Sequence, residues 1–342
     1  MPFPLYENVA VVGLARDEAP LIVGSDEIEA SLETTMRRLK LPKGLLASLT
    51  GIVRRRLYPF DYPPSQAAAA AAETLFGRLG FDRHKLDLIY STSVSRDHIE
   101  PSTASIVQRR LGLSGRVKSL DIGSACLGFI DGMELAALSI EANLVSHALI
   151  VAGENSAPIL KTTLTSLLEP GLNRGDFFRH FATLTLGSGG AAMILGRASD
   201  YPGAPRLVAS ASRSDATSNR LCQGDADGMA TDSAGLMAAG VALAKETFDL
   251  GAAEFGWKPG DFSRFICHQV SGANTRKLCE SLDLDQSRLV RTYPEYGNIG
   301  PVAVPFTLDL AYEQNLLPLH APYLLMGIGS GLGCAMLAIQ QP

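Results

Sequence analysis

The chain has 342 residues, of which 46% are hydrophobic and 19% are charged, and its formal net charge is −5. This length allows one large or two ordinary domains with a substantial core, and the composition is not that of a disordered chain. The lack of a basic excess argues against a nucleic-acid-binding protein.

No apolar run approaches the ~18 residues of a membrane span. The first residues, MPFPLYENVAVVG, lack the charged start and cleavable apolar segment of a secretory signal. Five scattered cysteines argue against a disulfide framework, and neither C-x-x-C nor H-E-x-x-H occurs. We therefore expect a cytoplasmic protein with reduced thiols, no membrane span and no metal.

The first half alternates strand-like and helix-like segments. Strand character is found at residues 9–14, 86–92, 117–122 and 147–154, and helical character at residues 25–41, 65–80, 102–111 and 127–140. Ser25, Ser65 and Ser102 stand at expected helix caps, and Gly80 stands at an expected helix end. This alternation predicts an α/β fold with a largely parallel sheet covered by helices on both faces.

Residues 155–182 interrupt the alternation with prolines, glycines and many large apolar side chains. A long apolar insertion of this kind predicts a cap, a substrate-channel wall or a subunit contact. After it, the strand–corner–helix pattern of the first half returns in residues 264–282 and 289–314. We therefore expect an N-terminal half, residues 1–212, which carries the insertion, and a C-terminal half, residues 213–342.

Cys126 lies in KSLDIGSACLGFIDG, between a predicted strand and a predicted helix. A thiol at a helix N-terminus feels the positive end of the helix dipole, which favours the nucleophilic thiolate. A buried structural cysteine is the alternative.

His268 ends the apolar segment FICHQV, and Asn298 lies in the turn YGNIGP. Each alone fits a structural role, but both occupy strand-to-helix corners like that of Cys126. If the two halves face each other, the three corners meet at one interface. A cysteine with histidine and asparagine donors is a set suited to acyl transfer, in which a thiolate attacks a thioester and donors hold the oxyanion.

The segments DIGSACLGF, CHQVSGAN, GNIGPVAVP and GIGSGLG together resemble the thiolase superfamily, specifically its ketoacyl synthase III-like enzymes, over essentially the whole chain. SVSRDHIEPSTASIV and GNIGPVAVP are most similar to the OleA-type members, which condense two fatty acyl-CoA molecules head to head. The resemblance implies the thiolase fold, with two pseudo-repeated α-β-α-β-α halves in five layers. It also implies a homodimer that takes coenzyme A thioesters as substrates and needs no cofactor.

The resemblance also implies residue roles. Cys126 would be the acylated nucleophile, and His268 and Asn298 would stabilise the enolate of the second thioester. The backbone N–H groups of Cys126 and Ser330 would form the oxyanion hole. Glu100, in RDHIEPS, would be the base and would enter the site from the other subunit. The alternative for Glu100 is a charge that favours the start of the next helix.

Substrate binding is less defined in the sequence. The aromatic residue that usually precedes T-G-I in ketoacyl synthase III enzymes is missing from residues 45–50. Arg54, Arg55 and Arg56 are candidates for the phosphates of coenzyme A or for an acidic acyl carrier protein, and a solvated charged face is the alternative.

We therefore expect an acyltransferase that performs a non-decarboxylative Claisen condensation of two acyl-CoA molecules and passes its product to other lipid-pathway enzymes. A decarboxylative 3-oxoacyl synthase III, which uses malonyl carrier protein, is the nearest alternative. A non-condensing subunit that completes a partner's site is a second alternative.

Overall fold

The computed structural model describes residues 5–225 and 228–342, and its centre is a nine-stranded sheet. In spatial order the strands are β11 (Phe265–Cys267), β12 (Pro322–Gly329), β13 (Gly333–Gln340), β8 (Arg206–Ser214), β1 (Val9–Glu18), β7 (Gly189–Arg197), β6 (His147–Glu154), β4 (Leu88–Ser91) and β5 (Lys118–Asp121). Every residue of β6 is buried, which explains the continuous apolar run in its sequence.

The sheet is mixed, so the prediction of a largely parallel sheet is wrong. Only β4 with β5, β4 with β6, and β11 with β12 pair in parallel among the described strands. The pairs β1–β7, β6–β7, β12–β13 and β13–β8 are antiparallel. The short glycine turn between β12 and β13 permits only an antiparallel return, because a parallel return needs a long crossover.

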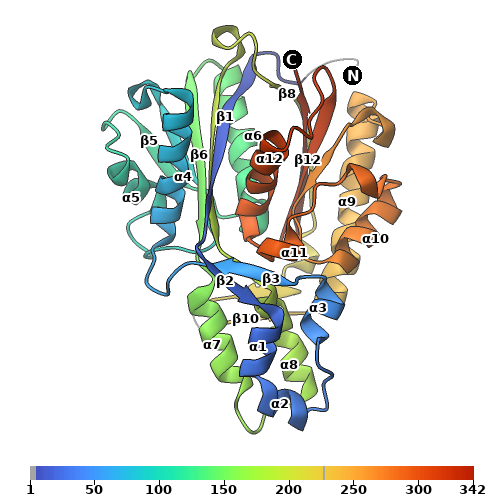
Figure 1. Cartoon of the computed structure of the whole chain (residues 1–342). Coiled ribbons are helices and arrows are strands. Elements are labelled where there is room, and N and C mark those ends of the chain that lie inside the picture. The colour runs from blue at the N-terminus through green and yellow to red at the C-terminus, as the bar shows by residue number, and fades with distance from the viewer. Residues whose placement is uncertain (1–4, 226–227) are drawn as a thin grey trace.

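Helices cover the sheet in layers. The helices on the sheet are α4 (Pro64–Leu79), α5 (Thr103–Arg110), α6 (Gly128–Glu141), α9 (Ser233–Phe255), α10 (Gly272–Leu282) and α12 (Ala303–Glu313). Helices α6 and α12 contact strands from both wings of the sheet, α4 packs on β1, β6 and β7, and α9 packs on β8 and β13. Figure 1 shows the result, with α6 and α12 central between two sheet wings and the other helices outside. This five-layered α/β arrangement is the predicted fold class.

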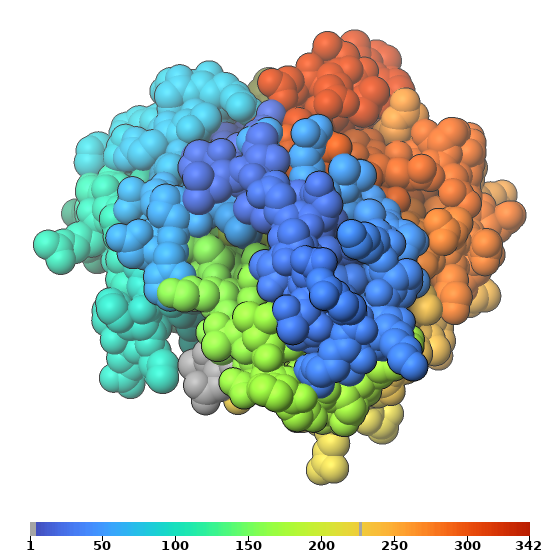
Figure 2. Space-filling model, turned by 60° about the horizontal axis from the view of Figure 1, so that its bottom comes forward, coloured from blue at the N-terminus to red at the C-terminus, as the bar shows by residue number. Residues whose placement is uncertain are grey.

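A smaller layer closes one end of the molecule. It contains the hairpin of β2 (Leu21–Gly24) and β3 (Arg54–Leu57), followed in space by α1 (Ser25–Ser31), α2 (Glu33–Arg38), α3 (Leu45–Thr50), α7 (Ala157–Leu167) and α8 (Arg174–His180). Ile28, Leu32 and Met36 pack with Leu160 and Phe177 in one apolar cluster. Figure 2 shows this end, where the segment of α1–α3 and that of α7–α8 form a continuous surface. The insertion at 155–182 is therefore part of a cap.

The remaining elements are short or connect to the site. They are β9 (Cys222–Gly224), β10 (Met229–Thr231) and α11 (Tyr293–Tyr296). No helix in the described ranges is long and apolar enough to cross a membrane.

Several predicted helix ends are in place and others are not. Ser102 caps α5 by accepting the N–H of Ser105, and Gly80 ends α4 in the left-handed conformation. The helix expected over residues 25–41 is instead two helices with a break at Leu32. The expected boundary at residues 212 and 213 falls inside β8, so the division into halves stays a prediction.

Candidate active site

Cys126 lies in a tight corner between β5 and α6. Ala125, the preceding residue, has a φ of +48°, in the left-handed region that alanine adopts at a cost of order 1 kcal/mol. Residues Ala125–Leu127 form a short 3₁₀ turn that leads directly into α6. The predicted strand, bend and helix around Cys126 are therefore present, and the strained residue turns the thiol toward an internal cavity.

The turn between β12 and β13 packs directly against this corner. A Cβ built on Gly329 would lie 2.6 Å from the Ser124 carbonyl oxygen and 2.9 Å from the Leu127 nitrogen, so only glycine fits there. This close approach brings Ser330 to the cavity that Cys126 lines. The two residues expected to supply the oxyanion hole are thus neighbours.

His268 directly follows β11, and its backbone N–H donates to the Met326 carbonyl at 2.8 Å. The adjacent Gln269 is buried and fixes this corner to the chain that leads to Asn298. Its Nε2 donates to the Val290 carbonyl at 2.9 Å, and its Oε1 accepts the Thr292 N–H at 2.8 Å. Gln269 was not predicted as a site residue from the sequence, where its position next to His268 is the one signal of this role.

Asn298 is held on three sides. Its N–H donates to the Thr185 carbonyl at 2.9 Å, and its carbonyl accepts the Gly187 N–H at 2.9 Å. Its side-chain Oδ1 accepts the Gly300 N–H at 3.0 Å. Since Oδ1 is used in this way, the amide nitrogen remains available as a donor to a ligand.

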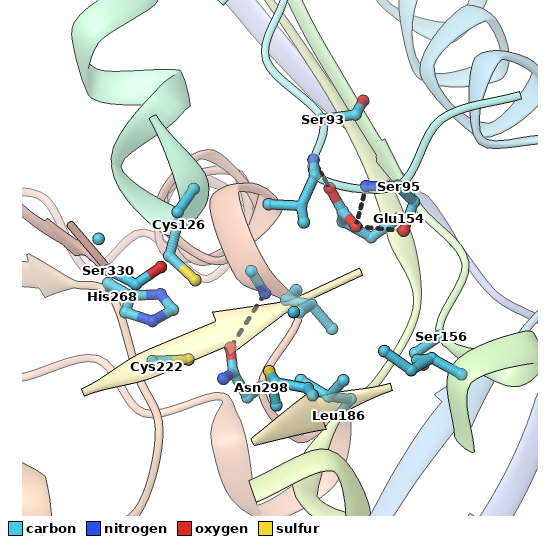
Figure 3. A pocket seen from close by; sticks show the side chains of 18 of the residues that line it. Ser93, Ser95, Cys126, Glu154, Ser156, Leu186, Cys222, His268, Asn298 and Ser330 are labelled. Carbon is cyan, nitrogen blue, oxygen red and sulfur yellow. Dashed lines mark hydrogen bonds between the residues drawn. The ribbon is translucent and has the colours of Figure 1, made fainter. Parts of the chain in front are cut away.

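One cavity of about 1340 Å³ contains Cys126, His268, Asn298 and Ser330 among its lining residues. Figure 3 shows these four side chains around one space, with Cys222 on β9 close to Asn298 and Glu154 farther along the wall. The volume exceeds the roughly 300–1,000 Å³ of ordinary ligand pockets. The three corners thus meet as the sequence predicted, and their roles remain predictions.

Apolar side chains dominate the deeper wall of this cavity. They come from α9, from strands β11–β13 with the turn between β12 and β13, and from α10: Leu236, Met237, Val241, Ala244, Cys267, Leu278, Met326, Ile328, Leu332, Cys334 and Met336. The cap adds Pro158, Ile159 and Ala182. Such walls can hold alkyl chains, because burial of apolar surface is favourable.

Cys126 and His268 lie in the packed part of the cavity wall, and loss of hydration there controls their charge states. Burial, with a smaller contribution from the Glu154 carboxylate, raises the pKa of the Cys126 thiol to about 12. Burial lowers the pKa of His268 to about 4, so its imidazole is neutral near pH 7. The direction of this shift is opposite to the expected preference for a thiolate at Cys126, since loss of hydration outweighs the helix dipole.

One ring nitrogen of His268 lacks a hydrogen-bond partner in the described part of the chain. This atom, Nδ1, is buried and has no hydrogen-bond partner within residues 5–225 and 228–342. The neighbouring Gly300 backbone opposes the fall in the His268 pKa. A neutral imidazole beside a neutral thiol can accept the proton of that thiol when the sulfur attacks.

Glu154 is a second buried group that the sequence analysis did not select. It ends β6, lines the cavity, and burial raises its pKa to about 7. Its carboxylate accepts hydrogen bonds from Val94 and Ser95. A glutamate at a strand end usually faces water, so sequence alone gave no sign of this burial.

Glu100 lies outside the cavity of its own chain. It is exposed, and the neighbouring Ile99 side chain is 92% exposed. His98 and Pro101 on either side of this pair do line the cavity. The structure therefore brings Cys126, His268, Asn298 and Ser330 together but leaves Glu100 at the tip of a surface loop.

Comparisons with known proteins agree with this geometry. The chain is 38% identical over 332 residues to the acyl-CoA:acyl-CoA alkyltransferase of Xanthomonas campestris, covering 97% of this chain and 98% of that protein. It is 32% identical to the enzyme of the same name from Shewanella oneidensis, covering 98% and 99% of the two chains. The chain belongs to the acyl-CoA:acyl-CoA alkyltransferase family.

Solved structures of OleA from Xanthomonas campestris match this family member closely. The structure of an OleA cysteine variant with bound lauric acid and lauroyl-CoA has a TM-score of 0.96 at 37% identity and covers 98% of this chain and all of that one. Residues 120–216 match the 3-oxoacyl-[acyl-carrier-protein] synthase III family, and residues 252–341 match its C-terminal part. The chain is thus an acyltransferase of the ketoacyl synthase III-like group with the thiolase fold.

The three arginines suggested for substrate binding have other partners. Arg55 is fully buried, where Nη2 donates to the Leu184 carbonyl at 3.0 Å and burial lowers its pKa to about 10. Arg54 pairs with Glu295, and Arg56 lies 3.6 Å from Glu18. None of the three lines the cavity within the described part of this alkyltransferase-family chain. The arginines support the hairpin and the Asn298 corner, which does not favour a phosphate-binding role.

Proposed function

We propose that the protein joins two fatty acyl-CoA molecules, without decarboxylation, into a 2-alkyl-3-oxoalkanoic acid through an acyl group bound to Cys126. The observation that carries this proposal is the large, mostly apolar cavity around Cys126, His268 and Asn298. Its volume has room for more than one acyl chain. Membership of the alkyltransferase family supports the same chemistry.

The solved OleA variants support the choice of residues. Their names report replacement of a cysteine, a glutamate and a histidine. These three positions have the same separations along the OleA chain as Glu100, Cys126 and His268 have here. We therefore assign Glu100 to the reaction although it is exposed in its own subunit.

In the first half of the reaction, the Cys126 sulfur attacks the carbonyl carbon of one acyl-CoA. The thiol proton passes to His268, which is neutral and faces the same cavity. The N–H groups of Cys126 and Ser330 donate to the oxyanion of the tetrahedral intermediate. The intermediate then collapses, the bond to the coenzyme A sulfur breaks, and the released thiolate takes the proton back from His268.

In the second half, Glu100 removes an α-proton from a second acyl-CoA. The His268 and Asn298 side chains donate to the enolate oxygen that forms. The enolate carbon attacks the Cys126 thioester carbonyl, the carbon–sulfur bond to Cys126 breaks, and the departing Cys126 sulfur takes up a proton, which balances the α-proton that Glu100 removed. Water then hydrolyses the remaining coenzyme A thioester, which gives the β-keto acid. An extender that loses carbon dioxide would not need the carboxylate base.

This scheme requires a dimer, since Glu100 must reach the cavity of another copy. Strand β5 lies at the edge of the sheet, with its outer side unpaired among the described strands. Large exposed apolar side chains occur on both sides of it in the sequence, in residues 94–144: Val94, Ile99, Leu120, Leu135, Leu138 and Leu144. Such side chains are typical of a surface that a second copy covers.

We also infer a cytoplasmic location, acyl-CoA rather than acyl carrier protein as the donor, and delivery of the product to further lipid-pathway enzymes. These points rest on the family and on the apolar cavity.

The test is incubation of the purified protein with one long-chain acyl-CoA and no malonyl donor. We expect free coenzyme A and a β-keto acid or its ketone breakdown product, and a Cys126 acyl adduct by intact mass. Turnover only with malonyl carrier protein, accompanied by carbon dioxide, would instead establish the decarboxylative 3-oxoacyl synthase. An inactive protein that needs a partner chain would establish a non-condensing subunit.

A further inference from the structure

The segment that carries Glu100 is anchored at its start by one buried carboxylate. We call residues 94–101 the Glu100 loop. Glu154 Oε1 accepts the Val94 N–H at 2.6 Å, and its Oε2 accepts the Ser95 N–H at 3.0 Å and the Ser95 hydroxyl at 2.5 Å. Glu154 is only 7% exposed. Figure 3 shows these contacts on the cavity wall.

The loop is held at two further places. In its middle, Asp97 accepts the Ser65 N–H at 2.9 Å at the start of α4. Just beyond its end, Asp121 accepts the N–H groups of Thr103 at 2.9 Å and Ala104 at 2.7 Å. The chain between the second and third anchors contains the exposed pair Ile99 and Glu100. The loop is therefore held by hydrogen bonds at its start, in its middle and just beyond its end, while Ile99 and Glu100 project into solvent.

Glu154 also lies against the Asn298 corner. A Cβ built on Gly300 would lie 3.7 Å from Cγ of Glu154, so this side chain fills the space beside Gly300. The Gly300 N–H is the group that orients the Asn298 amide. One buried side chain thus binds the root of the Glu100 loop and lies beside Gly300, whose N–H orients the Asn298 amide.

We propose that Glu154 is a positioning residue for condensation. Its carboxylate fixes the start of the Glu100 loop beside the Asn298 corner, and this fixes the direction in which Glu100 projects toward the active site of the other subunit. This inference rests on the proposed function of Glu100. Both carboxylate oxygens of Glu154 accept hydrogen bonds from the loop. These bonds hold the side chain in place, so we expect it to support the loop and not to react with substrate. Burial raises the pKa of Glu154 to about 7, and these donors offset the cost of its charge.

The experiment separates the two half-reactions in the full-length protein. For Glu154→Gln we expect condensation of a long-chain acyl-CoA to slow by about tenfold to hundredfold, because a small misplacement of a reacting group costs that much. Acylation of Cys126, followed by intact mass, should not fall, since it does not use Glu100. The Glu154 charge raises the Cys126 pKa, so its removal does not hinder ionisation of the thiol. Ser95→Ala, which removes one of the three hydrogen bonds, should give a smaller loss in the same direction.

Glu29→Gln is the matched control. Glu29 is also buried and also accepts two backbone N–H groups, from Gly44 at 2.6 Å and Leu46 at 2.7 Å, but it lies in the cap. Its replacement should leave the ratio of condensation to acylation unchanged. If Glu154→Gln does not fold, Ser95→Ala decides the question.

Equal losses of acylation and condensation in Glu154→Gln, or no loss in either, would overturn the proposal. A Glu100→Ala variant measured in parallel separates this result from a failure of the proposed function. If Glu100→Ala stops condensation while Glu154→Gln does not change it, only the role of Glu154 is wrong. If Glu100→Ala condenses normally, the proposed function itself is wrong.

Discussion

The Oδ1 atom of Asn298 accepts the Gly300 N–H at 3.0 Å, which leaves the amide nitrogen of Asn298 as the donor available to the cavity. Asn298→Asp keeps this acceptor and removes the donor. We expect condensation to fall by about 10²–10³-fold, the usual cost of losing one oxyanion donor, while acylation of Cys126 persists. Rapid-quench measurement of both steps would test this, and normal condensation would exclude Asn298 as a donor.

A second prediction concerns the contact between the glycine turn and the nucleophile corner. Gly329→Ala would place a Cβ 2.6 Å from the Ser124 carbonyl oxygen, so the corner must move. We expect acylation of Cys126 to fall at least about tenfold, as displacement of a reacting group by a fraction of an ångström allows. Gly203→Ala is the control, because its Cβ would meet no described atom within 4 Å. Equal acylation rates in the two variants would contradict the prediction.

The two cavity groups with shifted pKa values should affect stability in opposite directions. The folded pKa of His268 is lowered from 6.5 to about 4, so its stabilising contribution, present above pH 6.5, is lost as the pH falls toward 4. The folded pKa of Glu154 is raised from 4.5 to about 7, so its contribution, present below pH 4.5, is lost as the pH rises toward 7.

Glu154→Gln removes only the second of these contributions. Between pH 4.5 and 7 its free energy of unfolding should rise more steeply with pH than that of the unmodified protein, by about 3 kcal/mol in all at 1.36 kcal/mol per pKa unit. Urea unfolding at a series of pH values measures the difference. Parallel curves would show that the Glu154 pKa is not raised in the folded protein.

A fourth prediction follows from the partners of the arginines. Arg54→Ala breaks an exposed pair with Glu295 and should change the free energy of unfolding by less than about 1 kcal/mol. Because Arg54 and Arg56 do not line the cavity, their replacement by alanine should leave the KM for acyl-CoA unchanged. A large rise in KM for either variant would restore the phosphate-binding role suggested by the sequence.

The sequence predicted those parts of the site whose structure depends on residues that are close together in the chain. The corner at Cys126 follows from a short strand, a Gly-Ser bend and an apolar helix, all of which are local. His268 and Asn298 could be grouped with it because they occupy corners of the same pattern. The structure shows that the three corners line one cavity.

Other features depend on contacts between distant segments. Glu154 is buried because Val94 and Ser95 fold over it, and neither lies near it in the sequence. Arg55 is buried beneath Leu184 and Ser25, which belong to two other segments. The antiparallel direction of β7 likewise depends on how the chain leaves the cap. None of these has a local signature, so the sequence analysis missed them.

The measurement that tests the central claim most directly is complementation between two inactive variants, Cys126→Ala and Glu100→Ala, co-assembled and given one long-chain acyl-CoA without a malonyl donor. In a mixed dimer, the intact Cys126 of one subunit can receive the intact Glu100 of the other. We predict that each variant alone makes no β-keto acid and that the mixture makes it at a substantial fraction of the normal rate. A mixture that forms mixed dimers but no condensed product would contradict condensation by Cys126 with Glu100 supplied from the second subunit.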